Sequence, residues 1–144
     1  MRAHLLLSVL LLAVSSSSRA EGDLLLIVNS KNSVTNLERK QVVDIFMGRT
    51  TAFPNQQPAH PVDIDNANNL RAIFYKNLTG KNEAQVDAYW ATLVFAGRML
   101  PPEKLPDEAE VIKAVKNNRA AVGYVTRQTL PAGIKIVMEL SVPQ

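Results

Sequence analysis

The side chains that most often carry enzyme chemistry are scarce in this 144-residue chain. It has no cysteine, which excludes thiol nucleophiles, disulfides and cysteine-ligated metals, and its two histidines are His4 and His60. His4 lies in a predicted export signal, and a single remaining histidine cannot build a zinc or copper site of the ordinary kind. No G-x-S-x-G, phosphate-loop or G-x-G-x-x-G motif is present. We therefore expect no enzyme, no cofactor and no metal centre.

Two carboxylates, Asp63 and Asp65, are separated by one residue. On a strand they would share a face and could act as a carboxylate pair or as ligands of a hard cation. The simpler interpretation, which we prefer, is that Asp65 caps the helix that follows and that Asp63 is solvated.

A small-anion site is the one kind of site that the sequence supports. Two loops lead from a predicted strand into a predicted helix, and free N–H groups at a helix start favour phosphate, sulfate or carboxylate. Amide, hydroxyl and guanidinium donors lie in these loops, and we expect them to border one cleft: Asn29, Ser30, Asn66, Asn68, Asn69 and Arg71. Arg71 would supply a fork suited to an oxyanion. The alternative is simple helix capping, with Arg71 on a solvated face.

The first twenty residues have the pattern of a signal peptide. Arg2 and His4 precede a ten-residue apolar run, and Ser18 and Ala20 fit a signal-peptidase site that predicts cleavage before Glu21. The run is shorter than the roughly 20 residues that span a bilayer. Without a cysteine after it, a lipid anchor is excluded. We expect a periplasmic protein comprising residues 21–144.

Cleavage would remove most of the excess positive charge. The whole chain carries 16 basic and 13 acidic residues, and loss of Arg2 and Arg19 leaves 14 against 13. The remaining charges alternate in sign without a basic stripe, so nucleic acid is not an expected partner.

The hydrophobic pattern predicts a single α/β domain in three layers, a mixed sheet flanked by helices. Residues 24–28 form an apolar run typical of a strand buried on both faces. A capping box from Thr35 to Glu38 predicts the first helix, and residues 49–61 read as a loop. The remaining elements are predicted from periodicity: a strand at 61–65, helices near 70–78, at 83–95 and from 107, and strands at 120–125 and 134–140.

Four short segments, in order, resemble the phosphate ABC transporter substrate-binding protein family, which has the type 2 periplasmic-binding-protein fold. They are Asp44-Ile45-Phe46-Met47-Gly48-Arg49; Pro61-Val62-Asp63 with Arg71 and Phe74; Tyr89-Trp90 with Phe95-Ala96-Gly97-Arg98; and Ala121-Val122-Gly123-Tyr124-Val125. The resemblance covers roughly residues 24–138. It implies an exported solute-binding protein that binds phosphate or another small oxyanion for ABC-type uptake, with an inner-membrane permease as partner.

Two departures from the family qualify these expectations. Family members have two lobes that close on the ligand, whereas about 124 residues suffice for one lobe, which would bind weakly or need a partner. The phosphate-contacting segment of the family resembles Ser-Gly-Thr-Arg, where this chain has Asn68-Asn69-Leu70-Arg71. The alternative function is therefore a non-enzymatic envelope protein-interaction module that retains the fold without a ligand. Pairing as a homodimer is open in both cases.

Overall fold

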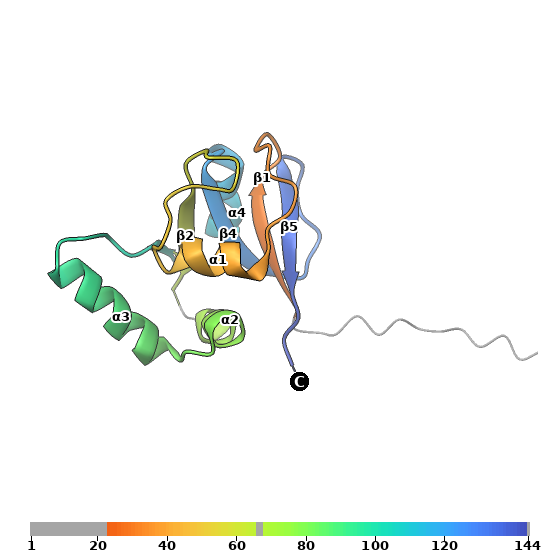
Figure 1. Ribbon diagram of the computed structural model, residues 1–144. Coiled ribbons are helices and arrows are strands. Elements are labelled where there is room, and N and C mark those ends of the chain that lie inside the picture. Colours follow the sequence, from red (N-terminus) through yellow and green to blue (C-terminus); the bar gives the residue numbers. More distant parts are fainter. Residues whose placement is uncertain (1–22, 66–67, 144) are drawn as a thin grey trace, which may run out of the picture.

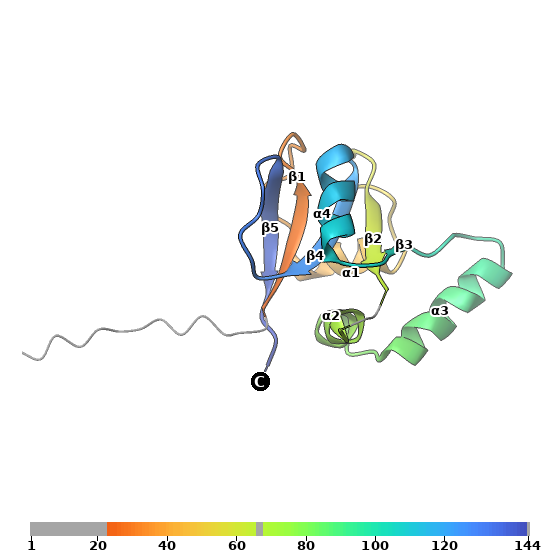
Figure 2. The ribbon, with the colours of Figure 1, turned by 180° about the vertical axis from the view of Figure 1, so that it is seen from behind.

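The computed structural model describes residues 23–65 and 68–143. The predicted signal peptide, its cleavage site and Asn66 lie outside the described residues. The chain folds into a five-stranded mixed sheet with helices on both faces, as the hydrophobic pattern predicts. Helix α1 (Arg39–Phe46) lies on one face and α4 (Glu108–Asn117) on the other, as the front and back views show (Figures 1 and 2).

The strand order is β3-β2-β4-β1-β5. Strands β2 (His60–Ile64), β3 (Glu103–Leu105) and β4 (Ala121–Thr126) are parallel to one another. Strand β1 (Leu24–Asn29) is antiparallel to both of its neighbours, β4 and β5 (Ile134–Leu140). The carboxyl end of β1 therefore lies at the opposite end of the sheet from the carboxyl ends of β2 and β4.

The core forms where the sheet meets the helices. All six residues of β1 are buried, as expected for a strand covered on both faces. The ring of Phe74 stacks on Tyr124 at 3.7 Å between centroids and meets the edge of Phe46 at 4.9 Å. Gly123 permits α4 to pack closely on β4, since an added Cβ would lie 2.6 Å from a methyl of Val111.

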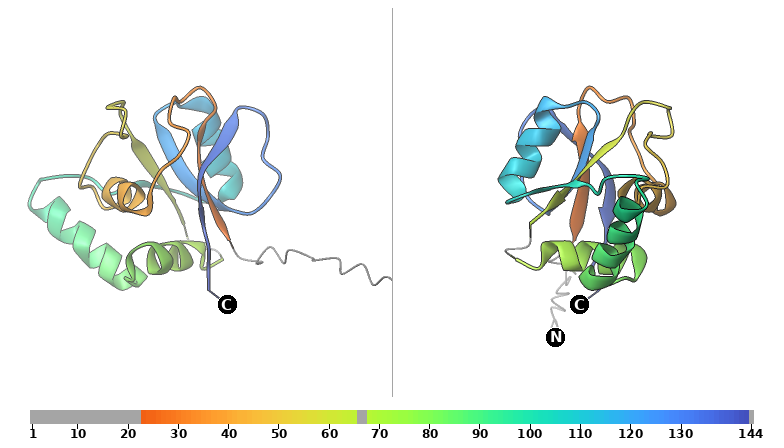
Figure 3. Two further views of the ribbon diagram at one scale, coloured as in Figure 1. Left: turned by 45° about the vertical axis from the view of Figure 1, so that its right-hand side comes forward. Right: turned by 90° about the vertical axis from the view of Figure 1, so that its left-hand side faces the viewer.

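Helices α2 (Leu70–Thr79) and α3 (Glu83–Phe95) lie outside the three layers. α2 crosses the end of the sheet where β2 stops, and α3 reaches away from the sheet (Figures 1 and 3). α3 is held at its inner side by buried Val86 and Trp90 and by the Tyr89 hydroxyl, which donates to the Met47 carbonyl at 2.6 Å. Trp90 in turn fits against Gly48, whose φ is +69°.

Three local predictions are wrong. The first helix begins after Glu38 instead of Thr35, because the Leu37 N–H is bound by the Val137 carbonyl of β5 and holds this segment extended. Gln41 then completes the capping box by accepting from the Glu38 N–H. Residues 103–105, where the sequence predicts no strand, form the edge strand β3. Helix α2 is preceded by Asn69 as its N-cap instead of Asp65.

Candidate functional site

A buried polar cluster centres on Asp63, near the carboxyl end of β2. One carboxylate oxygen accepts from the Ile64 N–H at 2.9 Å and from the Tyr124 hydroxyl. The other accepts from the Arg71 Nε at 3.0 Å and from the Tyr75 hydroxyl at 2.8 Å. The expectation that Asp63 is solvated is therefore wrong, because its charge is compensated by four donors inside the core.

Arg71 connects this cluster to α3. It lies in the first turn of α2 and only 4% of it is exposed, so the predicted alternative of a solvated face is wrong. Its Nη1 lies 3.4 Å from Glu83 and its Nη2 lies 3.0 Å from Asp87, both on α3. One buried and two outer carboxylates thus surround one guanidinium.

Ionisation behaviour follows from this burial. Desolvation and the neighbouring negative charge of Asp63 raise the pKa values of Tyr75 and Tyr124 well above the ordinary range of a phenol. Desolvation acts to lower the pKa of Arg71, but the charge of Asp63 and the hydrogen bond to it outweigh that effect and raise it. At neutral pH the cluster therefore combines two neutral phenols with a fixed ion pair.

Two hollows border the cluster and the start of α2. One, of about 260 Å³, is lined by Arg71, Asp87, Trp90 and Lys104 among others, so the Arg71 side faces an open space beside a second cation. The other, of about 220 Å³, is lined by Asn68 together with Asp65, Asp107 and Glu108. The first hollow is also lined by the carboxylate of Asp63, so two cations face two carboxylates there. No Lys or Arg lines the second hollow to offset its three carboxylates, which makes it unsuited to an anion.

The structure brings only part of the predicted anion site together. Asn68, Asn69 and Arg71 lie at the start of α2, where Asn69 has a left-handed backbone with φ +57°. Asn29 and Ser30 follow β1 and therefore lie at the other end of the sheet, since β1 runs opposite to β2. The expectation that these residues approach one cleft is wrong for Asn29 and Ser30.

Asn29 has a structural role at that other end. Its amide nitrogen donates to the carbonyls of Val115 at 3.1 Å and Lys116 at 2.8 Å, and its oxygen accepts from the Lys31 N–H. The carbonyls at the end of α4 thereby gain partners that the helix itself does not supply. Ser30 is exposed and its backbone N–H donates to the Gly133 carbonyl.

Sequence reasoning missed four members of the cluster: Tyr75, Glu83, Asp87 and Tyr124. One local signal was available, since Arg71 and Tyr75 are four residues apart and so share a helix face. Tyr124 is 61 residues from Asp63 along the chain, and only the pairing of β4 with β2 brings them together.

Other site types find no support in residues 23–65 and 68–143. No group of three or more His, Asp or Glu side chains in these ranges is arranged to hold a metal ion. Among the helices of the same ranges, none has the length and apolar character needed to cross a bilayer.

Comparisons with known proteins place the fold. No family model and no curated protein sequence matches the chain. Among solved structures, it is similar to an ABC-type phosphate transport receptor from Vibrio cholerae, with a TM-score of 0.61 and 20% identity. The alignment covers 79% of this chain and 44% of the receptor.

Two further structures agree. A protein described as a phosphate ABC transporter substrate-binding protein from Clostridium perfringens, solved with phosphate, gives a TM-score of 0.63 at 18% identity over 79% of this chain and 43% of that protein. PstS from Borrelia burgdorferi gives 0.53 at 12% identity, over 71% and 39% respectively. The chain spans less than half the length of each of these proteins. The predicted resemblance is confirmed at the level of the fold: the chain has the α/β fold of one lobe of the phosphate ABC transporter substrate-binding proteins.

Proposed function

We propose that this chain is an exported, non-enzymatic solute-binding protein that takes a small oxyanion, with phosphate as the first candidate, and serves ABC-type uptake. The supporting observation is the placement of Arg71. Asp63 holds its guanidinium in a fixed orientation at the start of α2, beside an open hollow that also contains Lys104. A guanidinium so oriented can offer an oxyanion a charge-assisted hydrogen bond from Nη2, the nitrogen that now faces Asp87. The shared fold with phosphate receptors supports the same proposal.

The two outer carboxylates, Glu83 and Asp87, compete with an oxyanion for Arg71. Glu83 and Asp87 occupy the Nη atoms that an oxyanion would use, and their charges oppose it. The side chain of Asp87 is 56% exposed, and such an ion pair contributes only about 0.2–1 kcal/mol. A charge-assisted hydrogen bond to a bound anion is worth about 1.5–3 kcal/mol. An oxyanion can therefore replace Asp87 at Arg71, with weak net affinity.

A partner would complete the site. One lobe offers contacts from one side only, and closure by a second surface would exclude water and supply further donors. We propose an inner-membrane permease or another envelope protein in this role. An exported protein would meet either kind of partner in the periplasm.

Calorimetric titration of phosphate, sulfate and small carboxylates tests the proposal. We expect weak binding by the native chain and about two- to fivefold tighter binding by Asp87→Asn, because that change removes from Arg71 a competing ion pair worth about 0.2–1 kcal/mol. Glu110→Gln, an exposed change on α4, is the matched control and should leave the affinity unchanged. The absence of heat at millimolar ligand in both the native chain and Asp87→Asn contradicts oxyanion binding.

A second candidate function is an envelope protein-interaction module that binds no ligand. The observation that favours it is a pair of exposed apolar side chains: Phe95, the last residue of α3, is 95% exposed, and Leu100, in the segment after α3, is 80% exposed. Crosslinking in the periplasm followed by isolation of the complex tests this candidate. A complex that is lost in Phe95→Ser, together with no anion binding by Asp87→Asn, favours the module over the solute-binding protein.

A further inference from the structure

Helix α3 is attached to the rest of the domain along a narrow surface. Two of its thirteen residues, Val86 and Trp90, are buried, and the helix lies outside the three layers of the fold (Figures 1 and 3). The indole Nε1 of Trp90 is buried without an acceptor among the described residues. A buried donor without a partner makes this seated position of α3 less favourable, since water would satisfy the donor if the helix moved away.

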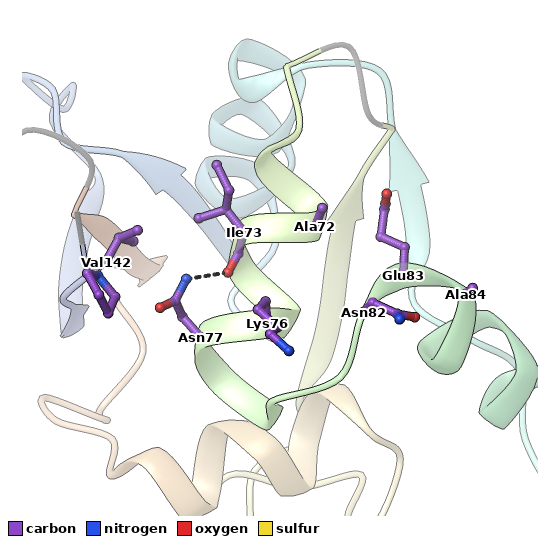
Figure 4. A pocket seen from close by; sticks show the side chains of 9 residues that line it. Ala72, Ile73, Lys76, Asn77, Asn82, Glu83, Ala84 and Val142 are labelled. Atoms are coloured by element: carbon purple, nitrogen blue, oxygen red, sulfur yellow. Dashed lines mark hydrogen bonds between the residues drawn. The ribbon is translucent and has the colours of Figure 1, made fainter.

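Hollows interrupt the contact between α3 and the body. A groove of about 620 Å³ lies between α2 and the first turn of α3, with Ala72 and Ile73 on one side and Ala84 on the other (Figure 4). The hollow of about 260 Å³ beside Arg71 extends along the middle of the helix as far as Val94. Gaps of this kind forfeit part of the packing energy that holds a helix in place.

Glycines lie at both ends of α3, where a hinge would be needed. Gly80 precedes the helix with φ +77° and Gly97 follows it with φ +66°. An added Cβ at either glycine would meet no atom within 4 Å in the described part of the chain. Glycine adopts positive and negative φ with similar ease, so both connections can change direction without a clash.

We propose that α3 is a hinged lid over Arg71, which lifts from the body while the sheet and the other helices stay folded. In the seated position Glu83 and Asp87 face the Nη atoms of Arg71, and lifting exposes that part of the guanidinium. Asp63 keeps its contact with the Arg71 Nε, at 3.0 Å in the seated form, because it belongs to β2. The lifted form therefore presents an oriented cation without its two outer carboxylates.

An oxyanion at Arg71 would favour the lifted form, a step that rests on the proposed function. A ligand shifts a conformational equilibrium toward the form that it binds more tightly, and lifting removes both competing charges at once. The apparent affinity of the native chain is then reduced by the fraction of molecules that are lifted. This reduction agrees with the weak binding that we expect of the native chain.

Thiol labelling at buried positions tests the lid, because the native chain has no cysteine. Val86→Cys places a thiol on the inner side of α3. Val115→Cys on α4 is the matched control, since both valines are helical and 0% exposed. Under native conditions Val86→Cys should react with a thiol reagent roughly tenfold faster or more, and with a weaker dependence on urea, because the control thiol is reached only by global unfolding.

The ion pairs and the anion should change this rate in a defined way. In the Val86→Cys background, Asp87→Asn should raise the rate about two- to fivefold, whereas Glu110→Gln should leave it unchanged. Phosphate at a half-saturating concentration should raise the rate severalfold, and sodium chloride of equal ionic strength should raise it less. Trp90 is the single tryptophan of the chain, so acrylamide quenching of its fluorescence repeats the phosphate test in the native protein.

The outcomes separate the lid from the proposed function. Equal labelling rates in Val86→Cys and Val115→Cys, or an unchanged rate with Asp87→Asn, would overturn the lid. Phosphate that binds in calorimetry without raising the labelling rate or the quenching of Trp90 would also overturn the lid, and the proposed function would stand. Fast labelling of Val86→Cys with no anion binding in calorimetry would support the lid and contradict the proposed function.

Discussion

Replacing Asp63 by asparagine tests the buried cluster with almost no change of shape. Each carboxylate oxygen receives one N–H donor, from Ile64 on one side and from Arg71 on the other. These donors cannot accept a hydrogen bond, so the asparagine NH₂ group meets an N–H whichever way the amide is turned. The change therefore removes a buried negative charge and leaves an unsatisfied donor.

The expected loss is large for a domain of this size. Breaking one side of a buried ion pair costs about 3–5 kcal/mol, against a typical total stability of about 5–15 kcal/mol. The outer carboxylates still compensate Arg71 in part, which favours the lower end, about 3 kcal/mol. At a urea slope of about 1.5 kcal/mol/M, the midpoint should fall by about 2 M.

Urea unfolding followed by circular dichroism measures this loss. Tyr124→Phe and Tyr75→Phe each remove one donor and retain the charge, so we expect each to cost about 1–2 kcal/mol. They also keep the series measurable if Asp63→Asn does not fold. If Asp63→Asn cost less than 1 kcal/mol, or less than either phenylalanine variant, the four-donor cluster would be refuted.

Three further predictions concern stability at alkaline pH, the contact of Trp90 with Gly48 that holds α3, and removal of the signal peptide. Burial raises the pKa of Tyr75 and Tyr124 in the folded state, so these two phenols ionise first in the unfolded chain as the pH rises above about 10. The free energy of unfolding should therefore be unaffected by them below that pH and should fall above it. The expected slope for the two groups together is roughly 2.7 kcal/mol per pH unit. Tyr124→Phe should halve the part of that slope due to these phenols, and an unchanged slope would contradict the burial. Gly48→Ala should cost about 2–4 kcal/mol, since it adds left-handed strain and places Cβ 2.5 Å from the Trp90 ring. Gly80→Ala, with φ +77° and no atom within 4 Å, is the control and should cost only about 1–2 kcal/mol; equal losses in the two variants would exclude the Trp90 contact. The mass of the exported protein should equal that of residues 21–144, and retention of residues 1–20 would refute cleavage before Glu21.

The elements predicted well from sequence are those fixed by local periodicity. The buried run of β1 and the stripe containing Leu70 and Phe74 are visible within a few residues of chain. The sequence does not show that β1 is antiparallel to the strands beside it, because a uniformly apolar run does not indicate which strands it pairs with or in which direction. That direction separates Asn29 from Asn69, and so the predicted six-residue cleft could not be checked without the sheet pairing.

The site was predictable only in part for the same reason. Arg71 stands out from the resemblance and from its place at a helix start, but its burial depends on Asp63 in β2 and on two carboxylates of α3. Asp63 itself resembles a solvated strand residue in sequence. Its four donors come from positions 64, 71, 75 and 124, and the last of these is a long-range tertiary contact.

The most direct test of the proposed function is the phosphate affinity of Asp87→Asn measured by calorimetry beside the native chain. Oxyanion binding at Arg71 predicts weak binding by the native chain and about two- to fivefold tighter binding by the variant. Arg71→Lys, which keeps the charge facing Asp63 but loses the planar fork, should lower the affinity in the Asp87→Asn background. No heat from any anion in the Asp87→Asn protein, or binding that Arg71→Lys leaves unchanged, would contradict the account.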